Sequence, residues 1–516
     1  MSAPDEQAPS PRPPRGGLAG VAARGMLWVS IAAAVARAAS FLSQVALGWL
    51  LDEHDYGLFA TAMSLSGIVA VLYGGGIPRI LIQEGARYAE IARPYYRIAL
   101  GFNLVAAAIL VLLGLGAGYL KGSPSLAWMM VIIGVSVPLG TSGIIYACKL
   151  SIDLRFRDTA LVNSLVALVR FGSAPLFALM GMGAFSLALP QVVAAGANWW
   201  LARRAVGEPL PPGLPPSRDL FRGVFSRSRW LMLGTLANVL VLQGDCLALS
   251  WIISQRTLGV YYFGYQLTRA IFILLEAGVL SVMMPTYASV ASEPGRLKAA
   301  YVRSIRLMAL AGAPVCIGFG LIAGPAVRLL WAGKWDSSIP VTQVFAFSLL
   351  ALVFWPLATA ACEALGRWRL RAGLKAAHGL GTTGAAAVAA LAGGDLVTIA
   401  ASVAAVHTLA SAAQVWWVGR QFGAGGLALL RAALPATLVS VAAGAAAYLL
   451  VVEGFGWRTP LAQGVGLAAA FALTFAGLAL ALLREPAADL LRLVTDRRRR
   501  RAQPERTIVD EQGIDE

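Results

Sequence analysis

The chain has 516 residues, of which 58% are hydrophobic and only 13% are charged, and its mean hydropathy is +0.70. Soluble domains carry about 25% charged residues and need a polar surface whatever the size of their core, so this composition excludes a soluble protein. The formal net charge of +16 would suggest a nucleic-acid partner in a soluble chain. Here the arginines lie between long apolar runs. This placement indicates that they orient the chain in a membrane and do not bind a nucleic acid.

Apolar runs of about 20 residues, each long enough to cross a bilayer, recur along the chain. They predict an all-α integral membrane fold with about 14 transmembrane helices. The predicted spans are Met26–Leu51, Gly57–Ile82, Tyr95–Tyr119, Ser125–Leu150, Asp158–Gly181, Met182–Ala202, Trp230–Ile253, Leu258–Met284, Val302–Gly324, Ile339–Ala364, Leu370–Leu391, Asp395–Gly419, Leu430–Val452 and Pro460–Leu483.

Positive charge alternates between successive loops. Arg203, Arg204 and the run Arg497–Arg501 fall on one side of the predicted spans, whereas the first loop on the other side, residues 52–55, is acidic. Because cytoplasmic loops are enriched in Lys and Arg, both termini are predicted to be cytoplasmic and the number of spans to be even. The run Arg497–Arg501 either binds anionic lipid heads or simply stops translocation.

The sequence also divides into two halves. The segment 203–229 is Pro-rich and is predicted to be a cytoplasmic linker. The pattern around Trp49 and Gly57 returns around Trp251 and Gly259 with the same spacing, which indicates a parallel internal repeat.

The chain carries none of the motifs that would indicate an enzyme or a metal protein. It has no Walker loop, no nucleophile elbow with partners and no His/Cys/Asp cluster, so no cofactor and no metal are expected. Cys148, Cys246, Cys316 and Cys362 lie in apolar runs without C-x-x-C spacing and are predicted to be packing residues.

Four arginines fall inside predicted spans: Arg37, Arg79, Arg170 and Arg269. A charge at mid-bilayer costs about 3 kcal/mol on insertion scales unless it is paired or hydrated, so each is a candidate functional residue. In one interpretation they line a wet cavity, where their forked donors suit phosphate, as in a pyrophosphate-linked lipid. In the other interpretation each is the structural partner of a carboxylate or a helix end, and Arg79 is near enough to the inner end of its span to snorkel.

The acidic candidates are Asp245 and Glu276. Asp245 is expected at a similar depth to Arg269 on the neighbouring helix. The two either form an ion pair, or Asp245 binds a proton or a sodium ion that drives transport. His378 and His407 are lone histidines without metal-ligand spacing and are expected to be ordinary packing residues.

Several short stretches resemble one family, in the same order along the chain. They are Gly25-Met26-Leu27-Trp28, Asp55-Tyr56-Gly57-Leu58-Phe59-Ala60, Gly74-Gly75-Gly76-Ile77-Pro78, Gly244-Asp245, Leu258-Gly259-Val260-Tyr261-Tyr262, Met284-Pro285-Thr286-Tyr287-Ala288, Trp331-Ala332-Gly333-Lys334-Trp335 and Ala364-Leu365-Gly366-Arg367. Together they resemble the Wzx-type oligosaccharide flippases of the multidrug/oligosaccharidyl-lipid/polysaccharide exporter superfamily, over about residues 20 to 480.

The resemblance implies two pseudo-symmetric six-helix bundles around a V-shaped central cavity, with two additional C-terminal helices. It places cationic residues against the lipid pyrophosphate, and Arg37 and Arg269 are the best counterparts by role and depth. The expected organisation is 1–24 disordered cytoplasmic tail, 25–202 first bundle, 203–229 linker, 230–419 second bundle, 430–483 additional helices and 484–516 basic cytoplasmic tail.

The activity implied is flipping of undecaprenyl-pyrophosphate-linked oligosaccharide across the bacterial inner membrane, for capsule, exopolysaccharide or O-antigen synthesis. No covalent chemistry is involved, so the chain is not expected to be an enzyme. The expected partners are the lipid-linked oligosaccharide, membrane lipids, and a polysaccharide polymerase with its chain-length proteins. Two alternatives stay open: a cation-coupled multidrug exporter of the same superfamily, and a membrane polysaccharide polymerase or ligase, which the short outer loops disfavour.

Overall fold

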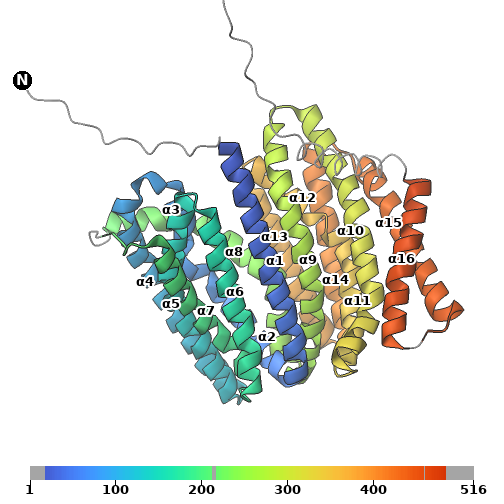
Figure 1. Ribbon diagram of the computed structural model, residues 1–516, viewed down its shortest axis with the longest axis horizontal. Coiled ribbons are helices and arrows are strands. Elements are labelled where there is room, and N and C mark those ends of the chain that lie inside the picture. Colours follow the sequence, from blue (N-terminus) through green and yellow to red (C-terminus); the bar gives the residue numbers. More distant parts are fainter. Residues whose placement is uncertain (1–17, 212–216, 458, 484–516) are drawn as a thin grey trace, which may run out of the picture. The chain divides into compact units, whose positions relative to one another are not determined.

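The computed structural model describes residues 18–211, 217–457 and 459–483, and these residues form helices and turns with no strand (Figure 1). A helix or a pair of consecutive helices occupies each of the fourteen predicted ranges. Within the described residues, eleven helical segments are long and apolar enough to cross a membrane. The prediction of an all-α, multi-pass membrane fold is therefore confirmed, whereas the count of fourteen crossings stays a prediction.

The chain divides into two compact units, residues 1–239 and 240–516. The division falls inside α8 (Arg218–Ile252), which begins before the predicted linker ends. The other end of that linker is also helical, because α7 (Phe185–Val206) continues past Arg203. Likewise α1 (Leu18–Leu50) begins inside the predicted disordered tail. The basic tail from 484 onward lies outside the described residues.

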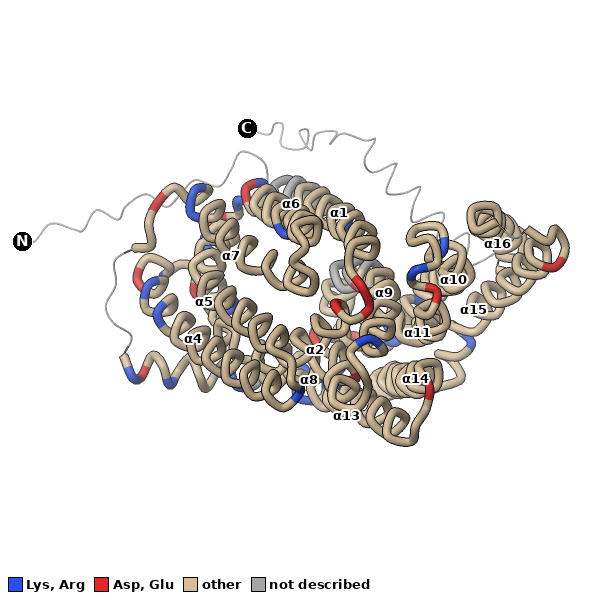
Figure 2. Tube along the Cα trace, turned by 90° about the horizontal axis from the view of Figure 1, so that it is seen from below, with Lys and Arg blue, Asp and Glu red and all other residues tan. Residues whose placement is uncertain are grey.

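In the first unit, α1 is followed by α2 (Glu53–Val69), the 3-10 turn η1 (Ala70–Gly76), α3 (Ile77–Gln83), the turn η2 (Gly85–Arg87), α4 (Tyr88–Leu120), α5 (Pro124–Ile152), α6 (Phe156–Leu179) and α7. Helix α4 packs on α5, α5 on α7, α7 on α6, and α6 on α1. Viewed along the helices, these elements follow one another around the unit, and most of the tube carries no charged residue (Figure 2).

In the second unit, the end of α8 is followed by α9 (Gln255–Ser289), α10 (Pro294–Trp331), η3 (Asp336–Ser338), α11 (Ile339–Leu352), α12 (Trp355–Ala364), α13 (Trp368–Leu391), α14 (Leu396–Gln421), α15 (Gly426–Tyr448), the π-turn η4 (Leu449–Gly454) and α16 (Pro460–Leu482). Helix α14 packs against both α11 and α13, and α10 packs against α11, α15 and α16. Several of these contacts thus connect helices that are not consecutive in the chain.

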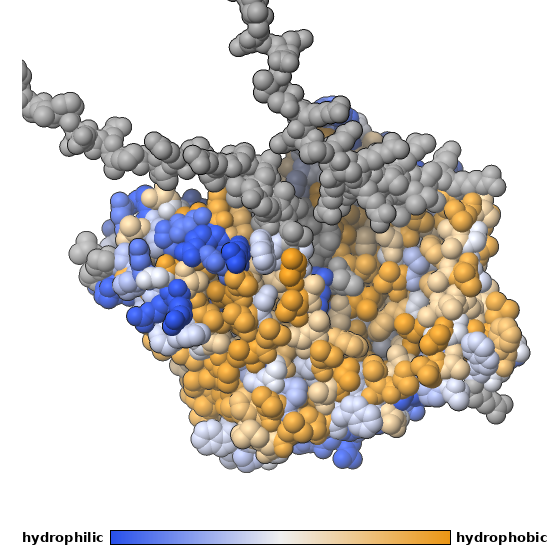
Figure 3. All heavy atoms as spheres, in the orientation of Figure 1, coloured by the Kyte–Doolittle hydropathy of each residue, from blue (hydrophilic) through white to orange (hydrophobic). Residues whose placement is uncertain are grey.

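The outer surface of the helices is apolar. Large side chains such as Leu112, Leu179 and Leu391 are 68%, 68% and 74% exposed. The space-filling view shows hydrophobic residues across the middle of the visible face and hydrophilic residues gathered toward one end of the first unit (Figure 3). A soluble monomer rarely exposes so much continuous apolar surface, so this surface is the one that contacts lipid.

The second predicted span is broken by its glycine run. Gly74, Gly75 and Gly76 have φ angles of +64°, +53° and +73°, a left-handed region that side chains disfavour. Asn103 of α4 holds this break, because its Oδ1 accepts a hydrogen bond from the Gly74 N–H at 2.8 Å and its Nδ2 donates to Thr141 Oγ1 at 2.7 Å. Asn103 therefore connects helices, as buried polar residues do in membranes.

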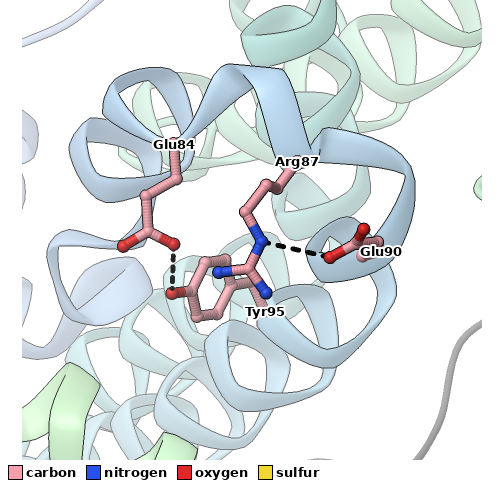
Figure 4. Close-up of polar contacts among 4 residues, drawn as sticks. All are labelled: Glu84, Arg87, Glu90 and Tyr95. Carbon is pink, nitrogen blue, oxygen red and sulfur yellow. Dashed lines mark hydrogen bonds and ion pairs between the residues drawn. The ribbon is translucent and has the colours of Figure 1, made fainter. Parts of the chain in front are cut away.

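A polar corner ends the same span. The Tyr95 hydroxyl donates to Glu84 Oε2 at 3.1 Å, and Arg87 Nε donates to Glu90 Oε2 at 3.1 Å (Figure 4). The Arg87–Glu90 pair is well exposed, at 66% and 68%, so its contribution to stability is small. Its exposure agrees with a position at the membrane surface, where the predicted inner loop turns into α4.

We expect the substitution Gly379→Ala to destabilise the second unit. A Cβ at Gly379 of α13 would lie 2.6 Å from Leu240 Cβ and 2.8 Å from the Val241 backbone N of α8, so the two helices would have to separate. Overpacking of this kind costs about 1–3 kcal/mol. Thermal unfolding can be followed with a thiol-reactive dye, because all four cysteines are buried and free.

Gly384→Ala is the matched control. Gly384 lies on the same helix, and no neighbouring atom lies within 4 Å of the position that its Cβ would take, so the midpoint of this variant should equal or exceed that of the parent protein, since alanine is the better helix former. Equal midpoints for both variants would contradict the close α8–α13 approach.

Candidate functional site

A partly open cavity, with about 410 Å³ of empty space that includes open solvent, lies in the second unit. Two helices supply most of its wall, and the lining residues have the same sequence spacing on each. They are Tyr265, Thr268, Arg269 and Phe272 of α9, and Phe345, Ser348, Leu349 and Leu352 of α11. Residues at i, i+3, i+4 and i+7 share one helix face, so each helix presents one continuous stripe to the cavity. The wall is completed by residues of α8, by Trp355 of α12 and by His407 of α14.

Among the described residues of this wall, Arg269 is the only one with a permanent charge. Its side chain is half-buried, and within the described residues it forms neither an ion pair nor a hydrogen bond. The aromatic rings of Tyr265 and Phe272 lie one turn to either side of it. A guanidinium among apolar groups, with five donors unused, suits an anion with several acceptor oxygens.

Trp355 adds a second donor to the wall. Its side chain is 4% exposed, and its indole Nε1 has no hydrogen-bond partner among the described residues. A buried N–H without an acceptor is uncommon and costs about 1–3 kcal/mol. The cavity therefore combines a cation with donors that lack acceptors.

The expected ion pair between Asp245 and Arg269 is not formed. Asp245 Oδ2 accepts from the Tyr261 hydroxyl at 2.7 Å, and its Oδ1 accepts from the Cys246 N–H at 2.8 Å. The reason is geometric: α8 and α9 form a hairpin that turns at residues 253–254, so Asp245 lies at the level of Tyr261. Arg269 is eight residues farther along α9, roughly 12 Å beyond that level. The prediction that Asp245 and Arg269 share a depth is wrong.

Glu276 lies two turns after Arg269 on α9 and is half-buried. It is within electrostatic reach of Lys375, Arg269 and Arg371. Its nearest charges are therefore cations of α9 and α13, which is the environment of a carboxylate that balances a positive cluster.

The other three arginines lie in the first unit. Arg37 of α1, Arg79 of α3 and Arg170 of α6 are all exposed, and the Arg170 guanidinium lies over the Phe171 ring at 5.7 Å from its centroid. Helices α1 and α6 pack together, so Arg37 and Arg170 occupy neighbouring helices. Their assignment as substrate-binding residues stays a prediction, because exposure alone does not separate a wet wall from a lipid-facing one.

The histidines differ from their expectation as lone residues. His378 Nε2 lies 2.8 Å from His407 Nδ1, and Gln414 Nε2 lies 3.3 Å from His378 Nδ1. The signal was available in the sequence: His378 is fourteen residues before Ala392 and His407 is twelve after Asp395, so a tight α13–α14 hairpin brings them to one level. Burying two imidazole rings without hydrogen bonds costs free energy, so each ring is expected to have a hydrogen-bond partner.

Lys375, one turn before His378, is also buried and lies over the Trp355 ring at 5.1 Å from its centroid. Nearer the start of the same helix, Arg371 Nη1 pairs with Glu363 Oε1 of α12 at 2.6 Å. Cationic groups thus follow α13 from its start to the histidine pair.

Asp52, His54 and Asp55 bring their ligand atoms within 4.8 Å of one another. Asp52 and Asp55 already have a structural role, because each accepts a hydrogen bond from the other's backbone N–H and so caps α2. The arrangement is accounted for by the helix cap, and we assign no metal to it.

Comparison with known proteins places these features in a family. The model of the family described as polysaccharide biosynthesis protein matches residues 46–340. The chain is 24% identical to the succinoglycan biosynthesis transport protein ExoT of Rhizobium meliloti, over 60% of this chain and 62% of that protein. It is 20% identical to the lipopolysaccharide biosynthesis protein WzxC of Escherichia coli, over 62% and 65%. The match thus spans less than two thirds of either relative.

Solved structures support the same fold. The lipid II flippase MurJ in an inward closed conformation superposes with a TM-score of 0.66 over 89% of this chain and all of that one, at 12% identity. An inward-facing multidrug transporter of the MATE family gives 0.57 over 75% and 95%, at 14% identity. Because the family model covers more than half of the sequence, the chain belongs to the polysaccharide biosynthesis protein family.

Proposed function

We propose that the protein flips lipid-linked oligosaccharide units across the bacterial inner membrane for surface polysaccharide synthesis, without covalent chemistry. The observation that carries the proposal is Arg269, a half-buried guanidinium that has no partner among the described residues and lies in the wall of an otherwise apolar cavity. The names of the relatives, a succinoglycan transport protein and a lipopolysaccharide biosynthesis protein, agree with this role.

The substrate we propose is an undecaprenyl-pyrophosphate-linked glycan. Pyrophosphate offers several acceptor oxygens to the Arg269 fork and to the Trp355 indole N–H, and a prenyl chain is compatible with the apolar outer surface of the helices. Arg37, Arg79 and Arg170 are our candidates for further contacts with the headgroup along the first unit.

In this proposal both termini are cytoplasmic and transport proceeds by alternating access of the two halves. Asp245 and Glu276 are our candidates for coupling to an ion gradient, since both carboxyl groups lie within the second unit. A polymerase and its chain-length proteins would take up the flipped units on the outer side.

The two alternative functions fit the site less well. A cation-coupled multidrug exporter often carries cationic substrates, which Arg269 would repel from the cavity wall. A polymerase or ligase would need polar catalytic groups, and the cavity wall supplies Ser348, Thr268 and His407 without the base–nucleophile contact that covalent catalysis requires.

Flipping is tested directly by deleting the gene in its own host and measuring on which leaflet the lipid-linked units accumulate. We expect accumulation on the cytoplasmic leaflet and loss of surface polysaccharide, both restored by the intact gene. An unchanged distribution of the lipid-linked units between the two leaflets would contradict the proposal. Increased resistance of expressing cells to cationic dyes would favour the drug exporter instead.

Arg269→Gln should reduce surface polysaccharide about tenfold or more at unchanged protein level, because it removes charge-assisted hydrogen bonds worth about 1.5–3 kcal/mol. Arg269→Lys should retain part of the activity, since it keeps the charge and loses the fork. Arg256→Gln is the matched control, because Arg256 is exposed at the start of the same helix and outside the cavity wall. Equal glycan in all variants would remove Arg269 from the site.

The position of Arg37 is tested by chemical labelling. We expect Arg37→Cys to react with a charged, membrane-impermeant thiol reagent, because the proposal places it on a wet wall. Leu42→Cys on the same helix, roughly 140° around its axis, should stay unreactive in hydrocarbon. The background is low because the native cysteines are buried. Equal protection of both positions would show that Arg37 faces lipid.

A further inference from the structure

The pair formed by His378 and His407 behaves as one acid–base unit. The two side chains are 1% and 4% exposed, and their facing nitrogens lie 2.8 Å apart. At this distance one proton lies between the nitrogens, since two facing N–H groups would repel each other. In the neutral pair, one ring therefore donates to the other.

Gln414 determines which nitrogen is still available. If its amide Nε2 donates to His378 Nδ1 at 3.3 Å, His378 carries its proton on Nε2 and His407 accepts at Nδ1. The only lone pair outside the bond between the two rings is then that of His378 Nδ1, which accepts from the Gln414 amide. An added proton binds there when the Gln414 amide turns its oxygen toward the ring. A second added proton would need to break the bond between the histidines.

The pair is connected to the Arg269 cavity. His407 and Trp355 both line that cavity, and the Trp355 ring lies against His378 with centroids 5.2 Å apart. A charge on the histidine pair would therefore sit in the wall of the proposed anion site, separated from it by no intervening helix.

The charge beside the pair is a cation. Lys375 lies one turn before His378 and opposes a further positive charge. The ionisable groups on the helices packed around the pair include Lys375 and Arg371 of α13, Glu363 of α12, Arg269, Glu276 and Tyr265 of α9, Asp245 and Cys246 of α8, Tyr301 of α10 and Arg420 of α14; α11 has none. Glu363 and Asp245 are already bonded to Arg371 and Tyr261.

We propose that the His378–His407 pair binds a single proton, and that this proton and an anionic phosphate group in the Arg269 cavity bind cooperatively. The anion part rests on the proposed function. An anion beside His407 compensates the added charge, and the added charge in turn attracts the anion. By linkage the effect is reciprocal: acid conditions tighten anion binding, and anion binding takes up a proton. A substrate headgroup would thus enter with one proton and release it when it leaves.

The test is anion binding by the purified full-length protein in lipid nanodiscs, with inorganic sulfate as a probe whose charge is constant in this range. We expect affinity to rise roughly fivefold or more on acidification from about pH 8 to about pH 5.5, because the added proton and the anion favour each other. Calorimetry in two buffers of different ionisation enthalpy should give close to one proton taken up per sulfate bound.

His378→Gln and His407→Gln should bind sulfate without this pH dependence and without proton uptake. His54→Gln is the matched control, because His54 is exposed in the first unit and is the remaining histidine of the chain. One result would overturn this inference and leave the proposed function standing. In that result, sulfate binding depends on Arg269, but the histidine variants take up as many protons as the parent protein. Absence of any Arg269-dependent sulfate binding would instead count against the proposed function.

A second measurement needs neither the His378 and His407 variants nor the anion. In His54→Gln protein labelled with ¹⁵N in the histidine rings, two residues give signals. We expect both rings to carry the proton on Nε2 at about pH 8 and to gain one proton together on acidification, as a coupled pair does. Two rings that titrate independently, or that stay neutral at about pH 5.5, would refute the shared-proton site.

Discussion

The free energy of placing charge in hydrocarbon constrains everything else in this molecule. An unpaired guanidinium at mid-bilayer costs about 3 kcal/mol on insertion scales, and more without water nearby. Arg269 forms no ion pair within the described residues, since Asp245 is bonded to Tyr261, and Glu276 acts on it only through space. A half-buried arginine without an ion pair either contacts water or binds an anionic ligand, and the cavity around Arg269 has room for either.

The helical hairpins decide which polar groups meet. In the α8–α9 hairpin, Asp245 meets Tyr261 and the Leu242 carbonyl meets the Tyr265 hydroxyl, each pair equally far from the turn. The α13–α14 hairpin brings His378 to His407 by the same rule. Close approach of α13 to α8 at Gly379 then places the histidine hairpin beside the hairpin that carries Arg269. Small residues at the crossing thus bring the two polar groups together.

Much of the fold follows from the sequence, and the site follows only in part. Apolar runs of about 20 residues predict the helices because a bilayer admits little else. The partners of Asp245 and His378 were missed because depth was judged from each span separately, whereas distance from the shared turn gives the correct pairing. The cavity wall could not be predicted, because it needs the contacts of α11 with α9 and α14, which are distant in sequence.

The lining of the cavity limits what it can bind. Most of its wall is apolar, which matches a compact anionic group beside Arg269 better than an oligosaccharide of several sugars. The hydroxyls of Tyr265, Thr268 and Ser348 already donate to backbone carbonyls. The wall then has Arg269, the Trp355 indole N–H and His407, and little else to hydrogen-bond a sugar ring. Under the proposed function, this cavity would bind the lipid headgroup and not the glycan. Different glycans on one carrier would then be accepted, because the charged end is the part that the proposed substrates share.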